Sequence, residues 1–148
     1  MAADAPAVLN LIKLSVGPRD VAELRRAQAR RLGEDPPLRH WTRMIPKRGA
    51  ELVDGGSIYW VVAGFVRVRQ RILAIEAGQE PDGRARAGLV LAPELVPVEA
   101  RATRPFQGWR YLLPDAAPPD LPAGVTEAEG LDALPPKLRR ELRELGLI

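Results

Sequence analysis

Three arginines at alternating positions are the residues of this sequence whose spacing points most directly to chemistry. Arg67, Arg69 and Arg71 fall in residues 65–75, where apolar and polar side chains alternate as they do along a strand. Alternate residues of a strand lie roughly 6.6 to 6.8 Å apart on one face, a spacing that can match successive phosphates of a nucleic acid. The strand is expected to expose the three arginines and to bury the opposite set, Val66, Val68 and Ile72. The alternative is a solvated outer face on which acidic side chains of neighbouring strands neutralise the arginines.

Two short segments combine aromatic rings with arginines, the combination with which proteins stack on bases and contact phosphates. One segment is Arg104-Pro-Phe-Gln-Gly-Trp-Arg-Tyr111, and the other is Arg39-His-Trp-Thr-Arg43. In the alternative interpretation, Trp109 and Tyr111 are core residues of a strand. The residues predicted to contact nucleic acid are Arg39, Trp41, Arg43, Lys47, Arg48, Arg67, Arg69, Arg71, Gln107, Trp109 and Arg110.

Catalytic chemistry has few candidate residues. Cysteine is absent, which excludes disulfides, thiol nucleophiles and thiolate metal sites. His40 is the single histidine, so the usual zinc ligand sets cannot be assembled, and the glycine motifs that bind dinucleotides or phosphates are missing. We therefore expect no metal and no cofactor. His40, Lys47 and Glu51 are the candidate polar centre of a small hydrolase acting on a modified nucleoside.

Composition indicates one globular domain with a mild basic bias. The chain has 148 residues, of which 46% are hydrophobic and 28% are charged. Residues 1–113 carry 18 Lys+Arg against 12 Asp+Glu, a net charge of +6, and residues 114–148 carry 4 against 7, a net of −3, which together give +3. Arginine supplies 19 of the 22 cations and suits forked recognition of phosphate, although a GC-rich genome produces the same bias. No apolar run approaches the roughly 20 residues of a membrane span and no signal peptide is visible, so a cytoplasmic location is expected.

The elements expected around these residues form an α+β domain. Extended stretches are predicted at residues 8–16, 39–45, 58–62, 65–75, 86–91, 95–102 and 108–113, helices at 19–32 and 136–145, and a helical turn at 47–53. Because the connections look too short for crossover helices, we predict a small, strongly bent antiparallel sheet or pseudo-barrel of five or six strands with two main helices. Residues 1–113 are the predicted core, 114–135 a proline-rich strap, and 136–148 a C-terminal helix that docks on the same domain.

Three segments of the chain carry a family resemblance: Thr42-Arg-Met-Ile-Pro-Lys-Arg48, Glu51-Leu-Val-Asp-Gly-Gly-Ser-Ile-Tyr-Trp60 and Arg104-Pro-Phe-Gln-Gly-Trp-Arg-Tyr-Leu112. They resemble a bacterial family of uncharacterised proteins of about this length, which implies no particular activity. At the level of the fold, a basic segment, a short helix, a glycine turn and two strands make residues 39–113 similar to PUA-like domains, including the ASCH and EVE groups. This similarity implies barrel strands around a basic groove that binds RNA or a modified base.

Three functions from different classes stay open at the level of the sequence. The leading one is binding of RNA or a modified nucleotide, with arginines on phosphates and aromatic rings on bases. A deep pocket that holds Lys47, His40 and Glu51 together would instead favour the hydrolase. An extended apolar patch without a basic concavity would favour a protein-interaction module, and the oligomeric state is open in every case.

Overall fold

Seven strands and two helices make up residues 8–122 and 124–125, the part of the chain that the computed structural model describes. In chain order they are β1 (Asn10–Leu14), α1 (Val21–Glu34), β2 (Arg39–Thr42), α2 (Gly49–Val53), β3 (Ser57–Val62), β4 (Phe65–Gln79), β5 (Ala85–Leu91), β6 (Val96–Ala102) and β7 (Trp109–Leu112). The α+β class is confirmed, with more strands than the five or six predicted. The helix predicted at 136–145 lies outside the described residues.

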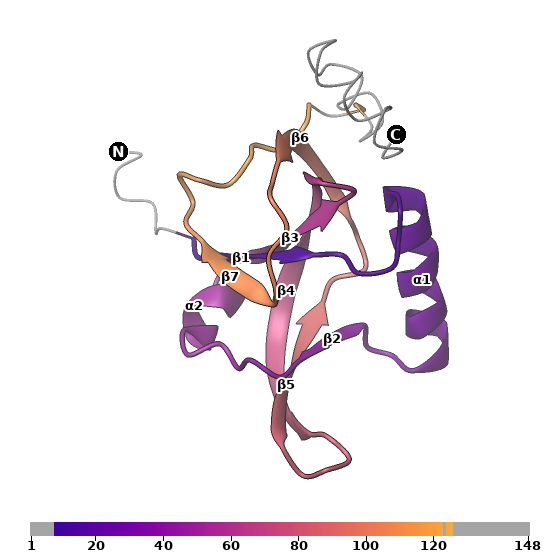
Figure 1. Ribbon diagram of the computed structural model, residues 1–148, viewed down its shortest axis with the longest axis vertical. Helices are drawn as coiled ribbons and strands as arrows, with labels where there is room; N and C mark the ends of the chain where they lie inside the picture. The colour runs from indigo at the N-terminus through magenta and orange to yellow at the C-terminus, as the bar shows by residue number, and fades with distance from the viewer. Residues whose placement is uncertain (1–7, 123, 126–148) are drawn as a thin grey trace.

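The strands form one mixed sheet in the order β2-β5-β4-β3-β1-β7, with β6 also paired to β4 (Figure 1). β1 is parallel to β3 and antiparallel to β7. The prediction of a purely antiparallel sheet is therefore wrong, because the chain between β1 and β3 holds α1, β2 and α2 and is long enough for a crossover. β2 and β7 end the strand order, so the sheet is open and not a closed barrel.

β4 is a long strand that pairs along its whole length and bends where the pairing shifts. β3 lies along one edge of its first half, while the other edge pairs first with β6 and then with β5. Arg67 is an extra residue relative to β3, and Leu73 is an extra residue relative to β5. On the other edge, β6 has three residues opposite Arg67. Such bulges bend a strand and re-aim the side chains on either side of them.

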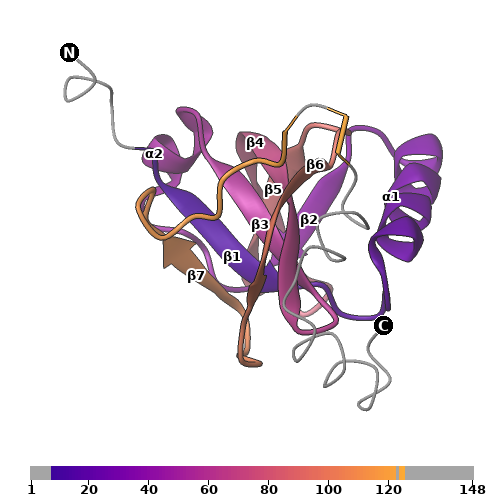
Figure 2. The same ribbon diagram turned by 90° about the horizontal axis from the view of Figure 1, so that it is seen from above.

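α1 begins where side chains satisfy its backbone. The Asp20 carboxylate accepts a hydrogen bond from the Glu23 backbone N–H at 2.8 Å, and the Glu23 carboxylate accepts one from the Arg19 N–H at 2.8 Å. The helix continues one residue beyond Gly33, which the sequence predicted as its end, and stops before Pro36. α1 and α2 lie at opposite ends of the sheet (Figures 1 and 2).

Two apolar clusters cover the two faces of the sheet. The larger cluster packs Val21 and Leu24 of α1 and Leu52 of α2 on strand residues such as Val68 and Leu89, while the smaller one contains Tyr59, Val61, Val66 and Val98. Every residue of β3 is buried, as its unbroken apolar sequence predicted. The described part of the proline-rich segment lies beside β6, where the Pro119 carbonyl accepts a hydrogen bond from the Glu99 N–H at 2.9 Å.

Candidate functional site

The arginines of β4 do not form the exposed face that their alternation predicted. Arg67 is 7% exposed, and the bulge at this position reverses the alternation, so that Val66 and Val68 lie in different apolar clusters. Val66, Val68 and Ile72 are all buried, but they do not share one face. The expectation of a single solvent-facing row of arginines is wrong because an extra residue in a strand turns the following side chains to the other face.

The other two arginines of β4 are engaged within the fold. The Arg69 guanidinium donates to both carboxylate oxygens of Asp120, at 2.7 and 2.8 Å, and to the Ser57 hydroxyl at 3.1 Å. This pairing lowers the pKa of Asp120 below its usual range. Arg71 is half-buried and donates to the Val53 carbonyl at 3.4 Å. A phosphate on this strand would have to compete with these partners.

The arginines of the β2 segment are paired with acidic residues of the β4–β5 hairpin. Arg39 donates to Glu76 at 2.7 Å, and Arg43 donates to Glu80 at 2.6 Å. This arrangement matches the alternative stated for the arginines of β4, in which acids of a neighbouring strand neutralise the cations. Each of these two arginines is therefore neutralised by a carboxylate within the fold.

Trp41 lies across the same hairpin with part of its ring exposed. A Cβ on Gly78 would come within 2.6 Å of this ring, and one on Gly88 within 2.9 Å, so glycine at both positions makes room for the indole. The Arg86 guanidinium carbon lies 4.0 Å from the centroid of the Trp41 ring, a cation–π contact. The side chain remains 37% exposed, so an incoming group can reach the ring beside Arg86.

The aromatic residues of β7 pack and form hydrogen bonds within the fold. Trp109 is 7% exposed, and its indole N–H donates to the Met44 carbonyl at 2.7 Å, so the alternative interpretation as a core residue is confirmed. The Arg110 guanidinium carbon lies 4.6 Å from the Phe106 ring centroid, whereas Gln107 is exposed. Stacking of a base on Trp109 would require the core to open.

The three candidate catalytic residues are not brought together. Lys47 and Glu51 belong to the α2 region, and His40 lies in the groove beside α1, across the sheet (Figure 1). The Glu51 carboxylate accepts hydrogen bonds from Arg48 at 2.6 and 2.8 Å, which lowers the pKa of Glu51. No group of three or more metal-ligating side chains occurs in the described part of the chain.

Concave surface gathers instead along α1. A cavity of about 200 Å³, here called the inner cavity, lies between α1, β1 and β2, and its polar lining consists of Lys13, Ser15, Arg31, His40 and the Trp60 ring edge. The described residues that line it include no carboxylate. The inner cavity is therefore a positively charged recess beside an aromatic ring.

His40 is the central polar residue of the inner cavity. Its Nε2 is buried and has no hydrogen-bond partner among the described residues, and its ring meets Trp60 edge to face at 5.3 Å between centroids. Burial, followed by the charges of Lys13 and Arg31, lowers the pKa of His40 from 6.5 to about 4. His40 is therefore neutral at pH 7, and its side chain forms part of the lining of the recess.

Lys13 is the second unsatisfied group of the inner cavity. No hydrogen bond or ion pair joins its ammonium group to another residue in the described ranges. Partial burial lowers the pKa of Lys13 from its ordinary value. A half-buried cation without a partner is costly, and an anion bound beside it would relieve that cost.

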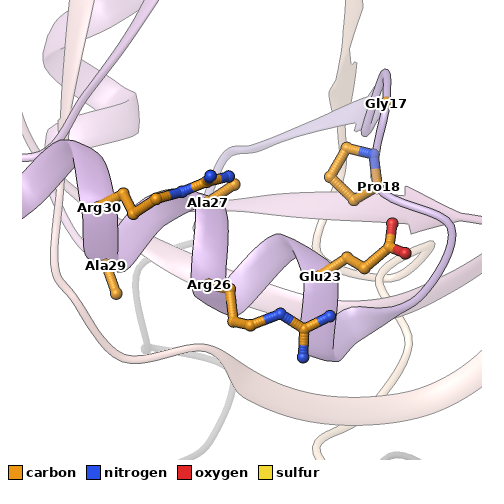
Figure 3. A pocket seen from close by; sticks show the side chains of 7 residues that line it. All are labelled: Gly17, Pro18, Glu23, Arg26, Ala27, Ala29 and Arg30. Atoms are coloured by element: carbon orange, nitrogen blue, oxygen red, sulfur yellow. The ribbon is translucent and has the colours of Figure 1, made fainter.

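Two further cavities adjoin the inner one, and we call the three together the α1 groove. The side cavity, of about 330 Å³, shares Arg31 and His40 with the inner cavity and adds Glu34, Asp35, Arg39 and Trp41. The outer cavity, of about 580 Å³, shares Pro18 and Ala27 with the inner cavity and adds Arg26 and Arg30. Figure 3 shows the Arg26 and Arg30 side chains running toward the N-terminal end of α1.

A buried amide network holds the wall of the groove in place. The Gln70 side-chain oxygen accepts hydrogen bonds from Gln28 of α1 at 2.9 Å and from the Trp60 indole N–H at 3.1 Å. The Gln70 amide nitrogen donates to Gln28 and to the Ala92 carbonyl, both at 2.8 Å. These bonds join α1 to β3 and β4 and set the position of Trp60 against His40.

Of the predicted site residues, Arg39, Trp41 and His40 lie in the α1 groove, and the others lie outside its lining. The sequence interpretation missed Lys13, Arg31 and Trp60 as site residues. One signal existed: Lys13 is the single charged residue within the apolar β1 strand.

A comparison with protein families identifies the chain. Residues 11–148 match the family described as "Protein of unknown function (DUF1489)", so the chain belongs to this family and the predicted family resemblance is confirmed. No curated protein and no solved structure matches the chain. None of the helices described is long and apolar enough to cross a membrane.

Proposed function

We propose that this member of the DUF1489 family binds RNA or a modified nucleotide in the α1 groove. Lys13 and Arg31 contact phosphate, the His40 imidazole contributes a hydrogen bond, and Trp41 borders the base. This assignment moves the binding surface away from β4, whose arginines have partners in the fold, to the side of the sheet that carries α1.

The observation that supports the proposal is the uncompensated positive charge of the inner cavity. Elsewhere on the sheet, Arg39, Arg43 and Arg69 each have a carboxylate within 2.7 Å. The described lining of the inner cavity holds Lys13 and Arg31 without any carboxylate. Cations gathered in a recess attract an anion, and phosphate is the anion that nucleotides present.

The finer description of the fold, a PUA-like pseudo-barrel, is part of the same proposal. Two hydrogen bonds support it by joining the chain that follows β2 to β7, the strand at the far end of the sheet order. The Trp109 indole donates to the Met44 carbonyl at 2.7 Å, and the Arg48 backbone N–H donates to the Tyr111 hydroxyl at 3.0 Å. These bonds support the proposal because they link the two ends of the strand order through side chains.

A salt titration of the full chain tests the proposal. Labelled single-stranded RNA and nucleoside monophosphates are titrated against the wild type, and for RNA the log of the affinity should fall by about 0.7 per log unit of salt for each phosphate contact. Replacing Arg31 by Gln should weaken binding at least tenfold, since a charge-assisted hydrogen bond is worth roughly 1.5 to 3 kcal/mol. It should also flatten the slope for RNA by about 0.7.

The matched control is Arg84→Gln. Arg84 pairs with Asp82 at the tip of the β4–β5 hairpin, so this variant removes the same charge outside the groove and should bind like the wild type. Equal weakening in both variants would show that net charge, and not the groove, governs binding. Failure of RNA and of nucleoside monophosphates to bind at low salt would refute the proposal.

A further inference from the structure

The inner cavity differs from the rest of the α1 groove in size and in charge. Its volume of about 200 Å³ lies below the roughly 300 to 1,000 Å³ of pockets that enclose a whole small-molecule ligand. It therefore suits one compact group of a ligand. The side chains that could bind it are those of Lys13, Arg31 and His40, which all line the cavity.

We propose that the inner cavity binds a terminal phosphate, so that the ligand is a phosphate monoester: a mononucleotide or the phosphorylated end of an RNA, and not the interior of a strand. This inference rests on the proposed function and specifies its ligand class. A monoester carries about −1.5 to −2 charges at pH 7, which matches two cations, whereas each internal diester carries one.

The acidic residues of the side cavity support the same assignment, because their carboxylates would repel a second phosphate. Glu34 and Asp35 line it beside Arg31 and Arg39. A strand that continued from the inner cavity in this direction would bring its next phosphate toward two carboxylates. A ribose meets no such conflict, since carboxylates accept hydrogen bonds from its hydroxyl groups. The charges thus place phosphate in the inner cavity and sugar in the side cavity.

Two polar side chains of the inner cavity, Lys13 and His40, have unpartnered nitrogens among the described residues. Lys13 has no ion-pair or hydrogen-bond partner among residues 8–122 and 124–125, and its pKa is lowered by burial. The neutral His40 ring can donate from one nitrogen, so it contributes a hydrogen bond to a phosphate oxygen without requiring protonation. The bound phosphate would compensate the desolvation of both side chains at once.

The test compares ligands that differ only at the terminal phosphate. Binding to the full wild-type chain is measured by calorimetry and by the fluorescence of Trp60 and Trp41, which border the inner and side cavities. The ligands are one short RNA with a 5′-phosphate, a 3′-phosphate or hydroxyl ends, together with a nucleoside monophosphate, its nucleoside and inorganic phosphate. We expect removal of the terminal phosphate to weaken binding at least tenfold, and inorganic phosphate to displace the phosphorylated ligands.

Variants test whether the inner cavity is responsible for the preference for phosphorylated ligands. Lys13→Gln should weaken the phosphorylated ligands at least tenfold and leave the hydroxyl-ended RNA unchanged, while Arg84→Gln should alter neither. Equal affinity for phosphorylated and hydroxyl-ended RNA would overturn the monoester assignment. If both RNAs bound equally well and Arg31→Gln abolished the binding of both, the proposed function would stand. The RNA strand would then run along α1 past Arg26 and Arg30. The comparison of ligands uses the wild type alone and does not depend on whether a variant folds.

Discussion

The buried His40 predicts a measurable loss of stability in acid. Because the folded-state pKa is about 4 and the unfolded value is 6.5, the unfolded chain binds more protons between these two pH values. The free energy of unfolding should therefore be highest above pH 6.5 and fall as the pH drops toward 4. A difference of about 2.5 pKa units corresponds to roughly 3 kcal/mol at about 1.4 kcal/mol per unit.

Urea denaturation of the wild type and of His40→Gln at pH 7.5 and pH 4.5 measures this term. Glutamine keeps a polar side chain at the site but does not titrate, so the variant should lose about 2 to 3 kcal/mol less than the wild type between the two pH values. Carboxylates with lowered pKa, such as Asp120, contribute equally to both proteins and cancel in the difference. Because His40 is the single histidine, its NMR titration gives an independent value. Identical pH dependence in both proteins, or titration of the imidazole near 6.5, would refute the reasoning.

Three further predictions concern the scaffold. Gly33→Ala should raise the free energy of unfolding by about 0.5 to 1 kcal/mol in a urea melt, because Gly33 lies in α1 and its added Cβ meets nothing within 4 Å. Gly56→Ala should fail to give a native circular dichroism melt, because its Cβ would lie 2.2 Å from the Leu9 carbonyl oxygen and the backbone cannot yield that far. Gln28→Leu should cost roughly 1 to 3 kcal/mol by leaving the buried Gln70 amide incompletely bonded, and it should shift the Trp60 fluorescence.

Local patterns allowed most of the strands to be predicted. The apolar run that became β3 and the turn after it were both recognisable, and the turn is made by Ala63 and Gly64, with φ of 51° and 86°. The alternation of β4 was misleading because a bulge is a property of the pairing between strands. Nothing in the residues around Arg67 shows that β3 has no residue opposite this position.

The candidate site was less predictable because tertiary contacts assemble it. Lys13, Arg31 and His40 belong to β1, α1 and β2, and they meet only because the chain crosses over α1 before β3 pairs in parallel with β1. The sequence interpretation assumed short antiparallel connections and therefore did not bring these elements together. Conversely, Arg39 and Arg69 looked available because their partners, Glu76 and Asp120, are 37 and 51 residues away.

The position of β1 between two other strands has a consequence for how the chain is made. β1 is the first strand to be synthesised, yet it lies between β3 and β7, and β7 begins 95 residues after β1 ends. At about 5 to 20 residues per second, a ribosome needs roughly 5 to 20 s to cover that distance. During that interval the nascent chain presents a mostly apolar strand with at least one open edge, the kind of segment that chaperones bind. The final pairing joins the two ends of the described chain, so folding is completed only after β7 has left the ribosome.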